Sequence, residues 1–288
     1  MPDRKMYYMC KYTPIELFAG FGVNCERLEP DTDSFDMAES LGHPNMCGYG
    51  KGLLEAVMTR QIRELILVNC CDVVRRVYDI LEQTKQLDFL YLLDLPHHAG
   101  EAEVRLFKSR IRSLLKAYEA YSGISFDEKA FLSFWGETGC RACGEPSQIS
   151  GKEDEFSRKE VEEEQGSWIS LQGAHSGAFL PELVKDCMPM TVRDETCTGN
   201  RFVPRPDFSS AGEEDVLTPY ARALLRQMPC MRMSDASRRK ELGKGASGII
   251  YHTMKFCDFY GFEQEQIEKE SKVPFVVVET DGTRQSEG

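Results

Sequence analysis

The protein is a chain of 288 residues with a formal net charge of −12, a sequence pI near 5.1 and a hydrophobic fraction of 41%. The length supports a sizeable core and one or two domains. No basic face stands out, so a nucleic-acid partner is not expected. No apolar run reaches the roughly 18 residues that a membrane span needs. The first residues also lack the apolar core of a signal peptide, so we expect no membrane association and a cytoplasmic location.

The cysteine content is the unusual feature of the composition. The sequence contains eleven cysteines. A secreted disulfide scaffold would be shorter and would carry a signal peptide. In a reducing compartment, many cysteines indicate metal or redox chemistry instead. The positions of the cysteines relative to the predicted strands and helices are therefore the main guide to function.

Extended and helical patterns alternate in the first half of the chain. Residues 64–69 form an apolar run that is typical of a buried strand, and residues 72–83 place Val73, Val77 and Leu81 at the spacing of a helix face. The expected strands are residues 5–9, 64–69 and 88–94, and the expected helices are residues 14–19, 48–61, 72–83, 101–121 and 127–135.

The alternation breaks at residues 139–166. This stretch contains Gly, Pro and Ser followed by an acidic run, in which seven of residues 152–165 are Asp or Glu. Such a composition is typical of a solvated linker. We therefore divide the chain into an N-terminal α/β lobe at residues 1–138, an acidic linker at residues 139–166 and a C-terminal α/β lobe at residues 167–288.

After this linker the alternation resumes. The expected strands are residues 168–172, 190–193, 248–252 and 274–279, and the expected helices are residues 178–185, 218–227 and 261–271. Strands separated by helices predict βαβ units and mostly parallel sheets. The predicted fold is α/β, with two Rossmann-like lobes. In such sheets ligands bind beyond the carboxyl ends of the strands and between lobes.

Four cysteines lie at the edges of these predicted elements. Cys71, Cys197 and Cys257 each follow a predicted strand, and Cys47 directly precedes a predicted helix. A helix N-terminus stabilises a thiolate, which is the form of cysteine that binds metal. Since Cys47, Cys71 and Cys257 are spread over both lobes, a common site would assemble only where the lobes meet.

Other candidate ligands carry weaker signals. Cys140 and Cys143 form a Cys-x-x-Cys pair in the expected linker, but zinc needs four ligands and no second pair is present. Cys70 adjoins Cys71 and could replace it as a ligand. The cysteines with an ordinary interpretation as core or neighbouring residues are Cys10, Cys25, Cys70 and Cys187.

The histidines and the glycine-rich turns give little information on their own. The five histidines show no metal-ligand spacing. The segment from Gly173 to Gly177 follows a predicted strand and precedes a predicted helix, so its amides could face an anion. It lacks the lysine of a nucleotide-binding P-loop and the full dinucleotide fingerprint.

Several motifs together resemble one enzyme family. The three cysteine motifs are Pro44-Asn-Met-Cys47, Cys71-Asp-Val-Val-Arg-Arg76 and Met254-Lys-Phe-Cys257-Asp-Phe-Tyr-Gly-Phe-Glu263. Further similarities are Tyr12-Thr-Pro-Ile-Glu-Leu17, Asp194-Glu-Thr-Cys-Thr-Gly-Asn-Arg201, Pro229-Cys-Met-Arg-Met233 and Val277-Val-Glu-Thr-Asp281. In this order, over nearly the whole chain, they resemble 2-hydroxyacyl-CoA dehydratase component D. That family includes 2-hydroxyglutaryl-CoA and phenyllactyl-CoA dehydratases and subunits of benzoyl-CoA reductase.

The resemblance implies a cofactor, partners and a reaction. A [4Fe–4S] cluster would be held by Cys47, Cys71 and Cys257, which leaves one iron open to an acyl-CoA substrate. An ATP-dependent activator protein with its own iron–sulfur cluster would deliver one electron. The substrate thioester would become a ketyl radical anion that expels hydroxide, which makes the enzyme a lyase. A sister dehydratase subunit is also implied.

Two alternatives stay open alongside this hypothesis. Related double-cubane cluster proteins, which are reductases of small molecules, use more cysteines, and Cys197 and Cys230 are the candidates for the extra ligands. A cysteine pair that those proteins tend to have near the first motif is absent here. In the other alternative, the chain is a non-catalytic, cluster-bearing partner subunit.

The resemblance raises two further expectations. Arg201 and Arg232 lie close to Cys197 and Cys230 and could meet CoA phosphates, because arginine pairs well with phosphate oxygens. Surface ion pairs are the alternative for both arginines. The family usually continues into a last helix beyond the position of Gly288, so we expect a truncated or unusual C-terminus.

Overall fold

A computed structural model describes residues 4–137, 167–177, 179–187, 190–199, 201–209 and 215–283. The predicted acidic linker, Cys140 and Cys143 lie outside these residues, so the division of the chain at residues 139–166 stays a prediction. None of the helices in the described part of the chain combines the length and the apolar character of a membrane span.

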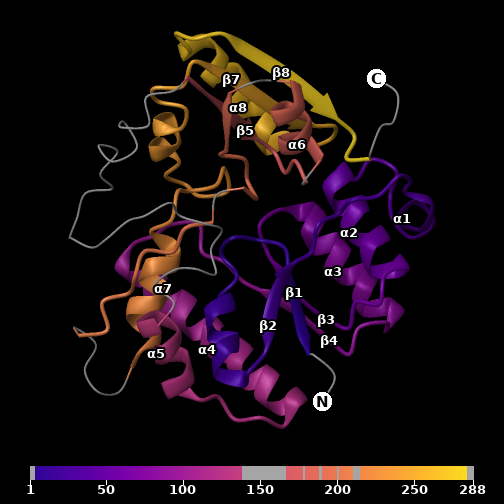
Figure 1. The fold of residues 1–288 in the computed structure, drawn as a ribbon. Helices are drawn as coiled ribbons and strands as arrows, with labels where there is room; N and C mark the ends of the chain where they lie inside the picture. Colours follow the sequence, from indigo (N-terminus) through magenta and orange to yellow (C-terminus); the bar gives the residue numbers. More distant parts are fainter. Residues whose placement is uncertain are drawn as a thin grey trace.

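The first sheet is built by the N-terminal part of the chain (Figure 1). Its four strands are all parallel and lie in the order β2-β1-β3-β4. The strands are β1 (Lys5–Tyr8), β2 (Asn24–Arg27), β3 (Glu64–Val68) and β4 (Phe89–Leu93). The helices around them are the 3-10 helix η1 (Ile15–Phe21) and α1 (Asp36–Leu41), α2 (Gly48–Thr59), α3 (Asp72–Thr84), α4 (Glu101–Ser122) and α5 (Glu128–Glu137). Strand β3 is buried throughout, because parallel sheets are covered on both faces.

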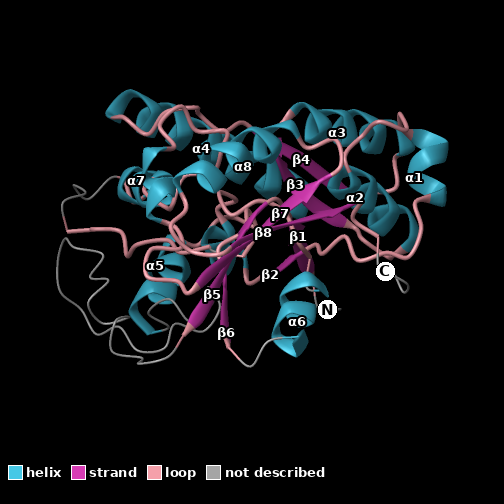
Figure 2. Ribbon diagram, turned by 90° about the horizontal axis from the view of Figure 1, so that it is seen from above, coloured by secondary structure: helices cyan, strands magenta, loops and turns pink. Residues whose placement is uncertain are grey.

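The second sheet repeats this topology (Figure 2). Its four parallel strands lie in the order β6-β5-β7-β8. They are β5 (Trp168–Gly173), β6 (Thr191–Asp194), β7 (Gly248–Met254) and β8 (Phe275–Thr280), accompanied by α6 (Phe179–Cys187), α7 (Leu217–Leu225), the 3-10 helix η3 (Ser237–Glu241) and α8 (Asp258–Glu270). The predicted α/β class with two Rossmann-like lobes is therefore confirmed.

The elements that the sequence did not predict are short or polar. Strand β2 has the sequence Asn-Cys-Glu-Arg, lies at the edge of its sheet and is only partly buried, so it lacks the apolar run of a central strand. Helix α1 and the 3-10 helix η3 were also missed, because both are short and mostly polar. Helix α8 begins at Asp258 instead of residue 261, which places Cys257 directly at its N-cap.

Helix α7 crosses from the second half of the sequence to the first lobe. The ring of Tyr220 is fully buried and packs edge-on against Phe131, with a centroid distance of 5.3 Å, and also against Trp135. Asp215, just before the helix, pairs with Lys108 of α4 at 2.6 Å. Helix α7 therefore belongs spatially with the first sheet, although the division of the sequence assigns it to the C-terminal lobe.

A buried ion pair joins the two halves of the chain. The guanidinium of Arg201 donates two hydrogen bonds to the carboxylate of Glu16, at 2.6 and 2.8 Å. It also donates to the carbonyls of Lys11 and Thr13, both at 3.0 Å. Burial alone would raise the pKa of Glu16, but Arg201 and the hydroxyl of Tyr220 more than offset that effect and lower it. The ion pair therefore links two segments that are far apart in sequence.

We predict that Glu16→Gln lowers the free energy of unfolding by about 3–5 kcal/mol, because it leaves the charge of Arg201 buried without its counter-ion. The matched control is Glu101→Gln, which breaks the exposed pair between Arg222 and Glu101. The control is expected to cost much less stability, because solvent screens an exposed ion pair. Chemical denaturation of both variants measures the difference in the free energy of unfolding. Equal losses of stability in the two variants would contradict the prediction that the buried pair stabilises the fold more than the exposed pair.

Candidate functional site

The two sheets place their reactive side chains at equivalent positions. An open parallel sheet binds ligands beyond the carboxyl ends of its strands, where the strand order reverses. This point lies between β1 and β3 in the first sheet and between β5 and β7 in the second. Cys10 and Cys71 follow the first pair of strands, and His175 and Cys257 follow the second pair.

These two sheet edges face each other. The backbone N–H of Tyr49, in the first turn of α2, donates to Sδ of Met254 at the end of β7, with an N–S distance of 2.8 Å. A Cβ atom on Gly48 would lie 1.6 Å from the carbonyl oxygen of Asp281, just after β8. Only glycine fits at position 48, because the backbones approach too closely for any side chain.

The three cysteines predicted as cluster ligands each occupy the N-cap of a helix. Cys47 caps α2, Cys71 caps α3 and Cys257 caps α8. None of the three thiols makes a capping hydrogen bond, but backbone N–H groups of the first helical turn lower the pKa of each thiol and so favour its ionised form. The positive end of each helix dipole acts in the same direction. The site therefore presents three thiols, each backed by a helix N-terminus.

These thiols lie close enough to influence one another's ionisation. Burial raises the pKa of Cys47 to about 11 and that of Cys257 to about 12. A thiolate at Cys71 adds to the rise at both positions, and a thiolate at Cys47 adds to that at Cys257. The pKa of Cys71 is lowered instead, chiefly because the thiol of Cys70 donates a hydrogen bond to it. The three thiols are thus within electrostatic reach of one another, and Cys71 is the one most readily ionised.

Further cysteines lie in the same buried region. Cys197 interacts electrostatically with Cys71, and Cys230 with both Cys197 and Cys10. Cys70 shares hydrogen bonds with Cys10 and with its neighbour Cys71. The sequence had treated Cys10 as an ordinary core residue, and its place in this group follows only from the fold. In the described part of the chain, no group of three His, Cys, Asp or Glu side chains has the arrangement that a single metal ion requires.

His175 is a member of the site that the sequence did not single out. Its ring stacks on that of Tyr49, with centroids 3.6 Å apart and planes within 6°. Nδ1 is buried and has no hydrogen-bond partner among the described residues. Burial lowers the pKa of His175 to about 4, so the imidazole is neutral near pH 7. The spacing of the histidines in the sequence did not point to His175. The glycine-rich turn after β5, in which His175 lies, was the feature of the sequence that could have indicated this residue.

The two arginines considered as phosphate ligands take part in contacts within the chain. Arg201 is used in the ion pair with Glu16. Arg232 donates from Nη1 to the carbonyl of Pro96 at 2.8 Å, and its own carbonyl lies 3.2 Å from Nδ1 of His97. Their contacts favour a structural role over CoA binding, which stays an untested prediction for both residues.

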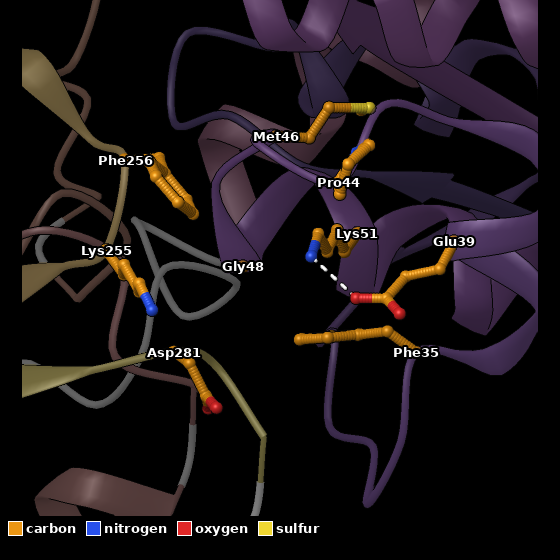
Figure 3. Close-up of a pocket in the computed structure, with 9 residues that line it drawn as sticks. All are labelled: Phe35, Glu39, Pro44, Met46, Gly48, Lys51, Lys255, Phe256 and Asp281. Carbon is orange, nitrogen blue, oxygen red and sulfur yellow. Dashed lines mark hydrogen bonds and ion pairs between the residues drawn. The ribbon is translucent and has the colours of Figure 1, made fainter.

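A cavity of about 320 Å³ opens beside the cysteine motifs (Figure 3). Met46 and Gly48, on either side of Cys47, form one wall, and Lys255 and Phe256, just before Cys257, form the other. The rest of the lining comes from Phe35, Glu39, Pro44, Lys51 and Asp281. A small molecule in this cavity would lie next to the backbone of two of the three candidate ligands.

The fold and the site together define a class: a two-lobed α/β protein with a buried thiol site at facing edges of two parallel sheets. A comparison with protein families matches residues 10–135 and 151–288 to the model for the 2-hydroxyglutaryl-CoA dehydratase, D-component. The chain belongs to this family of dehydratase components. No significant match to a curated protein was found.

We predict that the metal-free protein loses stability as the pH falls from about 7 to 4. Burial lowers the pKa of His175 and His252 to about 4, whereas in the unfolded chain histidine titrates near 6.5. The unfolded state therefore binds protons first, and each histidine contributes a loss of about 1.4 kcal/mol per pH unit within this range. Replacing His252 by Gln removes one of these protons and should make the decline shallower.

Denaturant titrations at pH 7 and pH 5 measure this change in slope. Nε2 of His252 shares a hydrogen bond with the hydroxyl of Thr280 at 2.8 Å. The difference in stability between His252→Gln and the wild type at pH 7 measures the loss of this contact. Exposed His43→Gln is the control and should decline as the wild type does. Parallel declines in all three proteins would contradict the prediction.

Proposed function

We propose that this chain is the iron–sulfur-binding component of an enzyme that removes water from a 2-hydroxyacyl-CoA by a radical route. A [4Fe–4S] cluster would be held by Cys47, Cys71 and Cys257. The proposal is supported by three thiols at helix N-cap positions on facing sheet edges, within electrostatic reach of one another, in a chain of the dehydratase D-component family. The enzyme would be a lyase, acting in the cytoplasm.

The chemistry of these residues suits such a cluster. Three thiolates satisfy three irons of a cubane and leave the fourth open to a substrate oxygen. When bound, the cluster supplies low-potential electron transfer and a Lewis-acidic iron. Because burial raises the pKa of Cys47 and Cys257, these thiols lose protons when metal binds, and the three helix N-termini offset the negative charge that results.

The surrounding residues would control access and solvent. The cavity beside Met46 and Phe256 provides an approach for the thioester, while the packed core behind the thiols excludes water. Stacking on Tyr49 holds the neutral imidazole of His175 in one orientation near Cys71. A sister dehydratase subunit is a proposed partner, since the family is described as one component of a larger enzyme. The second proposed partner, an ATP-dependent activator with its own iron–sulfur cluster, rests on the resemblance of the sequence motifs alone.

We predict that anaerobically purified protein contains about four irons and four sulfides per chain. Cys47→Ser, Cys71→Ser and Cys257→Ser should each lose most of this iron, because a serine hydroxyl is a poor replacement for a thiolate. Cys187 is exposed at the end of α6, so Cys187→Ser is the matched control and should retain the iron. Quantitation of iron and sulfide decides the point. Full iron in all three variants would refute the ligand assignment.

A double-cubane cluster is the second candidate, and one observation favours it: Cys197 interacts electrostatically with Cys71, and Cys230 with Cys197 and Cys10. This cofactor would make the protein a reductase of small molecules. It predicts roughly eight irons per chain, with iron loss in Cys197→Ser and Cys230→Ser. The single-cluster proposal predicts that both variants keep their iron. Cluster-loaded protein that binds no acyl-CoA would instead indicate a non-catalytic partner subunit.

A further inference from the structure

Two histidines lie at the paired ends of β5 and β7 and differ in how their ring nitrogens are satisfied. His252 uses both: Nδ1 lies 3.3 Å from the carbonyl oxygen of Ala174, and Nε2 lies 2.8 Å from the hydroxyl of Thr280. Nδ1 of His175 is also removed from solvent, but it has no hydrogen-bond partner among the described residues. A buried polar atom without a partner costs stability, so its retention calls for a partner outside the chain.

The stacking contact of His175 places its ring beside the cysteine motifs. The imidazole lies face to face on the ring of Tyr49, with centroids 3.6 Å apart. Tyr49 belongs to the first turn of α2, which has Cys47 at its N-cap. A thiolate at Cys71 also acts on the pKa of His175 and raises it, against the larger effect of burial. The unpartnered nitrogen is therefore within reach of the thiols contributed by the first sheet.

The turn that carries His175 is fixed by the backbone. Gly173 has a φ of 102°, and a Cβ atom at this position would lie 2.1 Å from the carbonyl oxygen of His252. The N–H of Ala174 donates to the same carbonyl at 2.9 Å, and the N–H of Cys197 donates to the carbonyl of Gly173 at 3.0 Å. The imidazole is thus held by its turn on one side and by the stack on the other, as a preorganised site requires.

The carboxylates near His175 already have partners. Asp194 and Glu29 both act electrostatically on the imidazole. Asp194 accepts hydrogen bonds from the N–H and the hydroxyl of Thr196, at 3.0 and 2.6 Å, and Glu29 pairs with Arg27. The other acceptors in this region are sulfur atoms. Thiolates and the inorganic sulfides of an iron–sulfur cluster accept hydrogen bonds, and these bonds tune the reduction potential of the cluster.

We propose that His175 is a positioning residue for the iron–sulfur cluster, with its Nδ1–H donating to a sulfur of the cluster or to the thiolate of Cys71. This proposal rests on the function proposed above and adds a residue that sets the reduction potential. The hydrogen bond stabilises the extra negative charge of the reduced cluster, so it raises the potential. Tyr49 fixes the plane of the donor ring, which directs the N–H without itself touching the cluster.

Two substitutions separate the hydrogen bond from the stack. His175→Phe keeps an aromatic ring on Tyr49 but removes the donor, whereas His175→Asn keeps an N–H near the position of Nδ1 but removes the ring. We expect His175→Phe to weaken electron uptake about tenfold, which shifts a one-electron potential by about 59 mV to more negative values. His175→Asn should stay close to the wild type. A reductive titration of the anaerobic, iron-loaded chain, followed by electron paramagnetic resonance, measures both potentials.

The matched control is His98→Phe, which makes the same exchange at an exposed position after β4 and should keep the wild-type potential. A wild-type potential in His175→Phe would overturn the proposal. Equal shifts in the Phe and Asn variants would overturn it as well, because they would show that the ring and not the N–H matters. Loss of iron in His175→Phe would mean that His175 ligates the cluster or supports the fold, which also contradicts the proposal.

A pulsed resonance measurement gives an independent readout of the hydrogen bond. In protein labelled with ¹⁵N-histidine, we expect a weak coupling between the reduced cluster and one histidine nitrogen, which disappears in His175→Phe. A strong coupling would indicate direct ligation of iron by the imidazole and would overturn the proposal. Wild-type protein without iron would refute the cluster assignment itself, and this outcome is distinguishable from iron-loaded protein whose potential does not depend on His175.

Discussion

The carboxyl edges of two parallel sheets face each other, and the rest of the structure depends on this constraint. In a parallel sheet every strand ends at the same edge, so the following turns and helix N-termini collect there. Here two such edges meet, and Cys47, Cys71 and Cys257 gather with the positive ends of three helices. The buried pair of Arg201 and Glu16 fastens the two halves beside this region.

Burial and helix dipoles act in opposite directions on the thiols. Desolvation raises the pKa of Cys47 and Cys257, although nearby backbone N–H groups act to lower the pKa of both thiols. Cys71 is the exception, because the neighbouring thiol of Cys70 donates to it. A metal-free site of this kind keeps most of its thiols protonated, and a bound cation would replace those protons. The arrangement favours a ligand that brings positive charge.

The two lobes share a topology but differ in the side chains that they contribute. In the orders β2-β1-β3-β4 and β6-β5-β7-β8, Cys71 and Cys257 occupy equivalent positions after the third strand. Cys10 after β1 corresponds to His175 after β5. The first lobe thus contributes a thiol where the second contributes a neutral imidazole stacked on Tyr49. The two sides of the candidate site therefore differ chemically, although the two lobes share a topology.

The sequence by itself determined the central strands, the parallel sheets and the placement of Cys47 and Cys71 at helix N-termini, because apolar periodicity and capping are local properties. The N-cap position of Cys257 became clear only from the structure, in which α8 begins at Asp258. Short polar β2 carried no such signal. Only the tertiary structure decided that Arg201 meets Glu16, 185 residues away, and that α7 packs on the first lobe. It also decided that Cys10 and His175 join the site. These contacts depend on how the two sheets are oriented toward each other, which no local pattern specifies.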